Sequence, residues 1–227
     1  MKQSLNVKCV IFDLDDTLYP QIEFDLGCLE EASRYISSLC GIHQSEIFCI
    51  LTKIITEKGI EYRKIFDDLF IEIKFDGMCH IKEILKYYWS ASPQISLFPN
   101  TDYILDCLKK KYLLAMITDG YVNVQKYKIN KLSLNNYFDN IYFTDSYGIK
   151  NRKPSKYVFD IFLKETKLSP KECVYIGNDP RKDFLPARSV GMHTIRIRQG
   201  SFSEMTLNEE YEADYTIQNI SQLINIL

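Results

Sequence analysis

The sequence of 227 residues has no paired cysteine motif and no excess of positive charge. Its seven cysteines are scattered singly, without the C-x-x-C spacing that binds zinc or forms a redox dithiol. We therefore expect buried, free thiols in a cytoplasmic protein, because the cytosol keeps thiols reduced. Lys and Arg number 28 against 30 Asp and Glu. This balance gives no strong positive field to hold a phosphate backbone, so we expect no nucleic-acid partner.

Long apolar runs and internal repeats are also absent from the sequence. No stretch approaches the roughly 18 apolar residues that span a bilayer, and no signal-peptide core fits before Asp13, so we expect no membrane partner. The three histidines do not have the spacing of a metal site. Hydrophobic residues make up 46% of the chain, which is enough to bury a sizeable core. The length fits one main domain with an insertion.

Short apolar runs alternate with helical patterns over most of the chain. The first predicted strand, 7–12, ends at an acidic cluster, and from about 24 to 89 the apolar residues recur every three or four positions, as in helices. Farther on, strands alternate with helices, which indicates a parallel α/β sheet. We expect a Rossmann-like core formed by 1–19 and 97–227, with an α-helical insertion at 20–96. The later predicted strands are 113–117, 141–143, 173–176 and 194–197, and the helices between them are 122–131, 156–167 and 183–189.

Acidic side chains follow three of the predicted strands. Open parallel sheets bind ligands at the carboxyl ends of their strands, so we expect these side chains to meet at one edge. Gathered carboxylates repel one another unless a cation neutralises them, and oxygen ligands favour Mg²⁺. The sequence therefore predicts a magnesium site at this edge. The residues that follow the three strands are Asp13, Asp15, Asp16, Asp119, Asn178, Asp179 and Asp183.

Four short segments resemble, in this order, the four motifs of the haloacid dehalogenase superfamily. They are Asp13-x-Asp15-x-Thr17, Thr118-Asp119-Gly120, Lys153-Pro154 and the acidic loop 177–183. The match covers nearly the whole chain, and the four pieces together are far more specific than any one of them. The resemblance implies that the helical insertion is a cap over the active site that helps to select the substrate. It also implies an Mg²⁺-dependent phosphatase that acts on a small phosphorylated metabolite, of the sugar phosphate or nucleotide class.

The first motif supplies two catalytic residues under this resemblance. Asp13 is similar to the nucleophile, whose carboxylate attacks the phosphoryl group and forms an aspartyl phosphate that water later hydrolyses. Asp15 is similar to the general acid that protonates the leaving oxygen and then activates water, and its backbone carbonyl would bind the metal. Dehalogenation is disfavoured, because a leaving halide needs no proton and the acid is present.

The second and third motifs supply the remaining catalytic residues. Thr118, with the backbone amides of Asp119 and Gly120, is expected to bind the phosphoryl oxygens. Lys153 is expected to offset the charge between Asp13 and the phosphate. Lys150 is the nearest rival, but Pro154 follows Lys153 and a helix begins soon after, as is typical of helix starts.

Two positions depart from the family pattern. The second motif usually has a neutral residue at Asp119, whose charge would repel phosphate unless it is paired or points away. The last motif has Asn178 where an acid commonly binds the metal, and Asp179 beside it carries the charge that Mg²⁺ favours. We expect the metal ligands to be Asp13, Asp15, Asn178 and Asp179, without deciding which of the last two binds directly. Asp183 is expected to organise the loop.

Two other functions are compatible with the same motifs. A sugar phosphomutase would pass the phosphoryl group of the same aspartyl phosphate to another hydroxyl instead of to water. A phosphate-binding regulatory module would keep the fold after Asp119 and Asn178 had weakened catalysis. Receiver-type signalling domains also have Asp, Thr and Lys at strand ends, but the helical insertion disfavours them. The sequence leaves the oligomeric state open between a monomer and a homodimer.

Overall fold

The computed structural model describes residues 5–227, which form two compact units. One unit contains the chain as far as Pro20 together with Ile95–Leu227, and the other is Gln21–Gln94. The first unit contains every strand of the sheet, and the second unit is helical.

A six-stranded parallel sheet forms the centre of the first unit, in the order β3-β2-β1-β4-β5-β6. The central strand β1 pairs with β2 on one side and with β4 on the other. The strand order reverses direction between β1 and β4, and doubly wound sheets bind ligands in the crevice at such a point. The predicted Rossmann-like α/β fold is thus confirmed. The strands are β1 Cys9–Phe12, β2 Leu113–Thr118, β3 Asn140–Phe143, β4 Cys173–Gly177, β5 His193–Ile197 and β6 Tyr215–Ile217.

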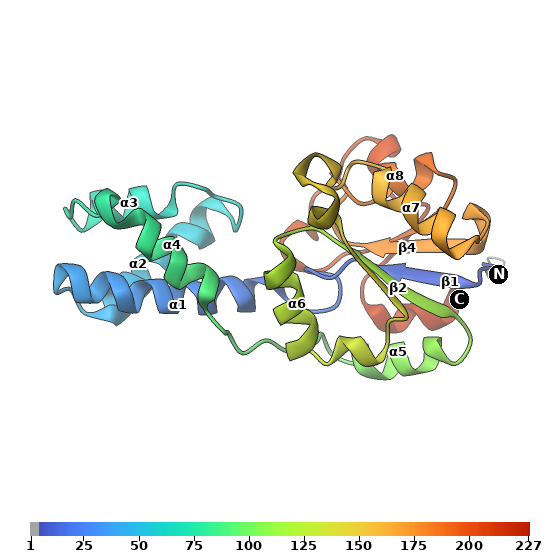
Figure 1. Cartoon of the computed structure of the whole chain (residues 1–227), viewed down its shortest axis with the longest axis horizontal. Coiled ribbons are helices and arrows are strands. Elements are labelled where there is room, and N and C mark those ends of the chain that lie inside the picture. The colour runs from blue at the N-terminus through green and yellow to red at the C-terminus, as the bar shows by residue number, and fades with distance from the viewer. Residues whose placement is uncertain (1–4) are drawn as a thin grey trace. The chain divides into compact units, whose positions relative to one another are not determined.

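Helices cover both faces of this sheet, which explains why its central strands are apolar throughout. All four residues of β1 are buried. Cys9 and Ile11 point toward one face, where they join a cluster with Phe159 and Phe162 of α7. In Figure 1, α7 and α8 lie on one side of the sheet and α5 lies on the other. The helices of this unit are α5 Thr101–Lys109, α6 Val122–Lys131, α7 Tyr157–Thr166 and α8 Phe184–Ser189.

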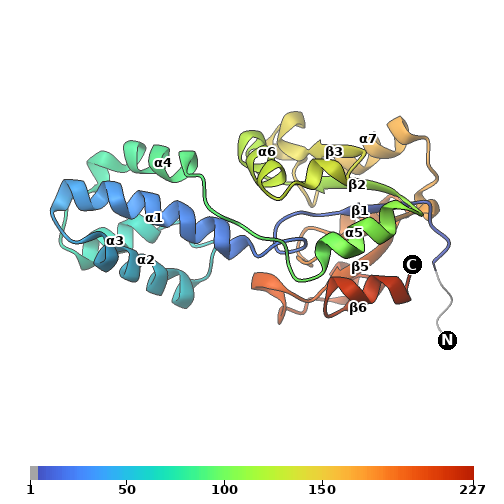
Figure 2. The same ribbon diagram turned by 90° about the horizontal axis from the view of Figure 1, so that it is seen from below.

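The second unit is a small helical assembly with its own apolar core. Its long first helix, α1, lies between α4 and α2 (Figure 2), and it contacts both. Apolar side chains at helical spacing on α1, among them Leu29, Ala32 and Ile36, are almost completely buried in this core. The helices are α1 Gln21–Cys40, α2 Gln44–Lys58, α3 Ile65–Glu72 and α4 Ile81–Ser90.

Three details differ from the sequence expectations. The short strand β6, Tyr215–Ile217, was not predicted, because three residues are too few to show a period. The apolar periodicity predicts a helix over 62–71, but helix α3 begins only at Ile65, after a turn. The seven cysteines are all free, but Cys49 and Cys79 are exposed, so the expectation of buried thiols is wrong for these two. Both lie in the helical unit, outside its core.

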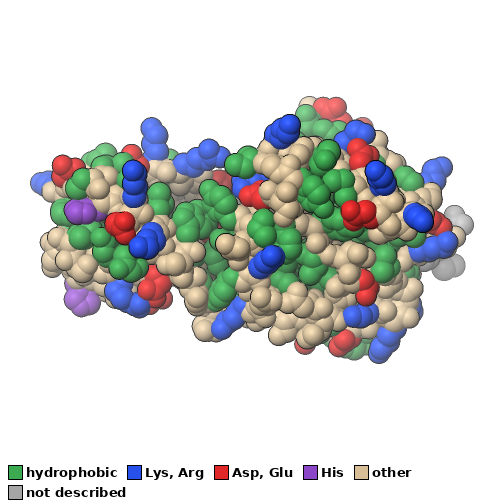
Figure 3. Space-filling view, in the orientation of Figure 1, with side chains coloured by type: hydrophobic (Ala, Val, Ile, Leu, Met, Phe, Trp, Pro, Cys, Tyr) green, Lys and Arg blue, Asp and Glu red, His purple; other side chains and the backbone are tan. Residues whose placement is uncertain are grey.

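The surface shows no large region of one charge in the view of Figure 3, where Lys and Arg are interspersed with Asp and Glu. None of the helices described for residues 5–227 combines the length and the apolar character needed to cross a membrane.

Candidate active site

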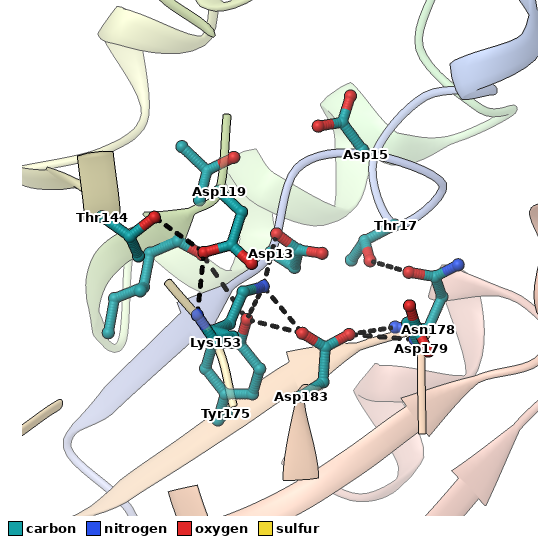
Figure 4. A network of polar contacts seen from close by, with 12 residues as sticks. Asp13, Asp15, Thr17, Asp119, Thr144, Lys153, Tyr175, Asn178, Asp179 and Asp183 are labelled. Carbon is teal, nitrogen blue, oxygen red and sulfur yellow. Dashed lines mark hydrogen bonds and ion pairs between the residues drawn. The ribbon is translucent and has the colours of Figure 1, made fainter. Parts of the chain in front are cut away.

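A buried lysine lies at the centre of the predicted site. The Nζ atom of Lys153 is 2.9 Å from Asp13 Oδ1 and 2.7 Å from Asp183 Oδ1, and it donates to Tyr175 Oη at 2.8 Å. Figure 4 shows these four side chains converging at the ends of β1 and β4. Burial alone would lower the pKa of Lys153, but the two carboxylates outweigh burial and raise the pKa well above its usual range. Lys153 is therefore a fixed positive charge beside Asp13.

Asp13 directly follows β1 and is 2% exposed. Burial raises the pKa of its carboxyl to about 7, although the charge of Lys153 opposes the shift. Oδ1 contacts Lys153, whereas Oδ2 is buried and has no hydrogen-bond partner among residues 5–227. A buried carboxylate oxygen without a partner is costly, so this atom suits contact with a cation or with an electrophilic atom of a substrate.

Asp183 organises the loop after β4. Its Oδ2 accepts hydrogen bonds from the backbone N–H groups of Asn178 and Asp179, at 3.2 and 2.9 Å. The loop is thereby folded so that the amide side chain of Asn178 meets the first motif, where Thr17 Oγ1 donates to Asn178 Oδ1 at 3.4 Å. This long bond leaves Asn178 Oδ1 weakly engaged.

Asp179, the other candidate metal ligand, is occupied by Arg181. The Arg181 guanidinium donates to Asp179 Oδ1 at 2.9 Å and to Oδ2 at 2.8 Å, and the backbone N–H of Arg181 donates to Oδ1 as well. Burial would raise the pKa of Asp179, but these hydrogen bonds and the nearby positive charges lower it. Both oxygens of this carboxylate therefore have a partner in the protein.

The second motif ends β2 and lies beside the same lysine. Thr118 is fully buried. Asp119 follows it, and its Oδ1 accepts a hydrogen bond from Thr144 Oγ1 at 2.7 Å and one from the backbone N–H of Lys153 at 3.1 Å. The additional carboxylate is therefore engaged by two neighbouring segments of the core. Gly120 has a φ of 123°, a conformation that residues with a side chain rarely adopt.

Asp15 lies apart from the lysine network, and its side chain points away from it in Figure 4. Its Oδ1 accepts from Lys128 Nζ at 2.6 Å and from Tyr19 Oη at 2.5 Å, and its Oδ2 accepts from Gln125 Nε2 at 2.8 Å. Burial would raise the pKa of Asp15, but the charge of Lys128 and these three hydrogen bonds lower it. The motif thus contains two carboxyls with opposite pKa shifts.

Asp16 supports the first motif instead of entering the site. It is buried with a φ of 53°, a left-handed conformation that Asp tolerates better than most residues. Its Oδ2 accepts from the backbone N–H of Ser201 at 2.9 Å, and a β-carbon on Gly200 would lie only 2.2 Å from the Asp16 Cγ. The loop after β5 therefore packs directly against the loop after β1.

The structure brings most of the predicted residues together and adds several that the sequence analysis missed. Asp13, Lys153 and Asn178 lie within one connected group, while Asp15 belongs to a separate network. Tyr175 lies within an apolar strand, and nothing in the sequence indicates that it belongs to the site. The spacing of Gln125 and Lys128, three apart on a predicted helix after the second motif, could have indicated that they share a face. The missed residues are Tyr19, Gln125, Lys128, Thr144 and Tyr175.

The oxygen atoms of the predicted metal ligands suit a small, hard cation that is bound by few side chains. Within residues 5–227 there is no group of three or more His, Cys, Asp or Glu side chains that could hold a metal. The predicted ligands, Asp13, Asp15 and either Asn178 or Asp179, do not need such a group, because Asp15 would bind through its main-chain oxygen and Mg²⁺ usually keeps several waters. The oxygen of Asp13 that has no partner fits such an ion.

Sequence comparison places the chain among known hydrolases. Residues 10–197 match a family model described as haloacid dehalogenase-like hydrolase. The chain is 35% identical over 225 residues to the glyceraldehyde 3-phosphate phosphatase of Methanocaldococcus jannaschii, with 97% of each chain covered. It is 31% identical over 236 residues to the protein of the same name from Methanothermobacter thermautotrophicus, covering 97% of this chain and 100% of that one.

Solved structures share the fold at lower identity. A haloacid dehalogenase superfamily hydrolase from Geobacter sulfurreducens has a TM-score of 0.72 and 17% identity, with 100% of this chain and 99% of that one covered. A hydrolase from Bacillus subtilis, solved bound to magnesium, has a TM-score of 0.68 and 20% identity, with 98% and 99% covered. With a family match over most of its length and a full-length relative above 30% identity, the chain belongs to the haloacid dehalogenase-like hydrolase family, as its four motifs predict.

Proposed function

We propose that this protein is an Mg²⁺-dependent phosphatase that hydrolyses a small sugar phosphate, with glyceraldehyde 3-phosphate as the first candidate substrate. The observation that carries this proposal is the 35% identity to a glyceraldehyde 3-phosphate phosphatase over 97% of both chains. Four further relatives with the same name align over 97% of this chain, at 25–31% identity. The proposal favours a sugar phosphate over a nucleotide within the class that the motifs imply.

Asp13 is the nucleophile in this proposal. One oxygen of its carboxylate attacks phosphorus, and the other would face the metal; Oδ1 contacts Lys153, and Oδ2 has no hydrogen-bond partner among residues 5–227. The new bond joins the attacking oxygen to phosphorus, and the bond between phosphorus and the sugar oxygen breaks. The side chain of Lys153 is buried, and its positive charge offsets the negative charge that develops on the phosphoryl oxygens.

Asp15 completes the proton balance. As general acid it gives a proton to the departing sugar oxygen, and as general base it then takes a proton from the water that attacks the aspartyl phosphate. The products are the free sugar, inorganic phosphate and the regenerated Asp13 carboxylate. These roles need Asp13 ionised and Asp15 protonated, whereas the protein alone raises the pKa of Asp13 and lowers that of Asp15. A cation bound at Asp13 would favour its ionised form, and a phosphate group beside Asp15 would favour the protonated form of that carboxyl.

Magnesium would be held by Asp13, the main-chain carbonyl of Asp15 and Asn178. We propose Asn178 instead of Asp179 as the direct ligand, because Arg181 already engages both oxygens of the Asp179 carboxylate. Asn178 Oδ1 has one long hydrogen bond, from Thr17, and a cation could replace it at little cost. When bound, the ion supplies positive charge that draws the phosphate toward Asp13 despite their like charges.

The phosphoryl oxygens would be bound by Thr118 and by the amides of Asp119 and Gly120. The charge of Asp119 does not prevent this, because Thr144 and the backbone of Lys153 donate to its carboxylate. The residue departs from the family pattern, but its side chain serves to join the second motif to the third. Its backbone amide remains the functional group toward phosphate.

We also propose that the helical unit Gln21–Gln94 is a cap and that the remainder is the catalytic core. The first connection between the units begins directly after the catalytic loop, at Pro20. A cap in this place would exclude water while phosphate is transferred and would provide contacts to the sugar.

The function is tested by phosphate release from glyceraldehyde 3-phosphate in the presence of magnesium. We expect wild type to release phosphate, and we expect Asp13→Asn to lose at least about 10³-fold in kcat/KM. Asp160→Asn is the matched control, because Asp160 is exposed on α7 and its carboxylate pairs with the exposed Lys156. Equal activity in wild type and Asp13→Asn would refute the role of Asp13 as nucleophile.

Product analysis in the same assay separates the remaining functions. Free phosphate in step with loss of sugar phosphate supports hydrolysis, whereas an isomeric sugar phosphate would indicate a mutase. Turnover of other phosphate esters without turnover of glyceraldehyde 3-phosphate would refute the proposed substrate. Binding without any turnover would indicate a regulatory module.

A further inference from the structure

Two buried polar side chains on α6 belong to none of the four motifs. Gln125 is 1% exposed and Lys128 is 4% exposed. They are three residues apart, so they lie on the same face of the helix. Burying a lysine is costly unless its charge is paired, and an apolar residue would pack at this position without that cost. Their burial therefore calls for an explanation beyond packing.

Both side chains donate to the carboxylate of Asp15. Lys128 Nζ lies 2.6 Å from Oδ1, and Gln125 Nε2 lies 2.8 Å from Oδ2. Tyr19 Oη is a third donor, 2.5 Å from Oδ1. Donors on both oxygens fix the plane of the carboxylate as well as its position, because rotation about the Cβ–Cγ bond would break bonds on each side.

Gln125 also ties Asp15 to the site that is proposed to bind phosphate. Its Nε2 carries two hydrogens, and it donates to Thr118 Oγ1 at 2.7 Å as well as to Asp15. Gly120 leaves room for this side chain, because a β-carbon there would lie 3.3 Å from Gln125 Cδ, which is tighter than ordinary contact. One amide thus joins the end of β2 to the loop after β1.

We propose that Gln125 and Lys128 are positioning residues that hold Asp15 at a fixed angle and distance from the leaving oxygen of the substrate. This inference rests on the proposed function, in which Asp15 is the general acid. Neither residue contacts the phosphate in this scheme. They act through Asp15, and through the distance that Gln125 sets between Asp15 and Thr118.

The leaving group distinguishes this role from a merely structural one. An alkoxide such as that of a triose is a poor leaving group, so its departure depends strongly on proton donation, whereas 4-nitrophenolate leaves with little help from an acid. Misplacing Asp15 should therefore slow an alkyl phosphate more than an aryl phosphate. A general loss of folding or phosphate binding would slow both equally. The quantity to compare is kcat/KM, which reports the steps through transfer of phosphate to Asp13.

The experiment measures kcat/KM of the full chain for glyceraldehyde 3-phosphate and for 4-nitrophenyl phosphate, with magnesium present. We expect Lys128→Met and Gln125→Leu to lose about 10²-fold on the alkyl ester and less than about tenfold on the aryl ester. Lys128→Arg should recover part of the difference. Lys131→Met is the matched control, since Lys131 is an exposed lysine on the same helix, and it should leave both values unchanged.

Asp15→Asn is the reference that separates the two proposals. If Asp15→Asn shows no preference for the aryl ester, the acid role of Asp15 fails and the proposed function must change. If it shows the preference but Lys128→Met and Gln125→Leu lose equally on both esters, or lose nothing, the positioning role is overturned. Lys128→Gln, which keeps a donor without the charge, replaces Lys128→Met in this comparison if circular dichroism shows that Lys128→Met is unfolded.

Discussion

Replacing Lys153 with methionine should destabilise the α/β unit strongly. The Lys153 side chain is fully buried, and its Nζ atom contacts two carboxylates that are themselves almost completely buried, those of Asp13 and Asp183. Methionine fills a similar volume but leaves both carboxylates without their cation. Removing one partner of a buried ion pair costs about 3–5 kcal/mol, because an uncompensated charge remains. We therefore expect the free energy of unfolding of Lys153→Met to fall by about this amount, out of a typical total of about 5–15 kcal/mol.

Urea unfolding followed by far-UV circular dichroism measures this change. Fluorescence of the single tryptophan, Trp89, reports on the helical unit separately, since it lies in α4. Lys150→Met is the matched control, because Lys150 is exposed and only three residues away, and it should change the free energy by no more than about 0.5 kcal/mol.

A second substitution tests the electrostatic cause. Asp183→Asn keeps an oxygen that can accept from the backbone of the loop after β4 while it removes one of the two charges. In the double variant with Lys153→Met, we expect about 0.5–3 kcal/mol of the loss to be recovered. The prediction fails if Lys153→Met lowers the free energy of unfolding by less than about 1 kcal/mol, or if the double variant is less stable than Lys153→Met alone. Either result would show that unpaired buried carboxylates are not the cause of the loss.

Three further predictions follow from the site. Asp119→Asn should retain wild-type stability to within about 1 kcal/mol, because an amide oxygen can still accept from Thr144, and thermal unfolding will show whether it does. Asn178→Ala should raise the magnesium concentration needed for half-maximal activity more than Asp179→Ala does, and the opposite order in metal titrations would make Asp179 the ligand. With magnesium chelated, wild type should lose stability relative to Asp13→Asn as pH rises from about 4 to 7. The reason is that burial raises the pKa of Asp13 to about 7, so the native state retains a proton that the unfolded chain has released, and urea titrations across this range will give the slope.

Local features of the sequence were enough to predict the fold and the edge of the sheet at which the candidate site residues meet. An apolar run that stops at a carboxylate marks a strand end, and parallel strands place their ends at one edge, so Asp13 and Asn178 could be expected at the same edge. The family, the α/β fold and the enzyme class are confirmed by the comparisons and the structure. The catalytic roles, the domain roles and the metal ligands stay predictions.

The contacts that complete the site could not be predicted, because they depend on the direction of side chains far apart in the sequence. Nothing near Asp119 in the sequence shows that Thr144, at the end of β3, will donate to it. Tyr175 looks like any apolar strand residue, yet its hydroxyl meets Lys153. The long β-to-α connections of a parallel sheet separate such partners by tens of residues, and the packing of the strands alone decides which of them meet.

The contact between Asp16 and Gly200 predicts a pattern of paired change in relatives of this protein. A side chain at position 200 would occupy the space of the Asp16 carboxylate, so the two positions cannot vary independently. Across an alignment we expect glycine at 200 wherever an acid stands at 16, and a larger residue at 200 only where 16 has become small. Such covariation would identify relatives in which the chain after the fifth strand takes the same path, and it would do so without reference to the four motifs.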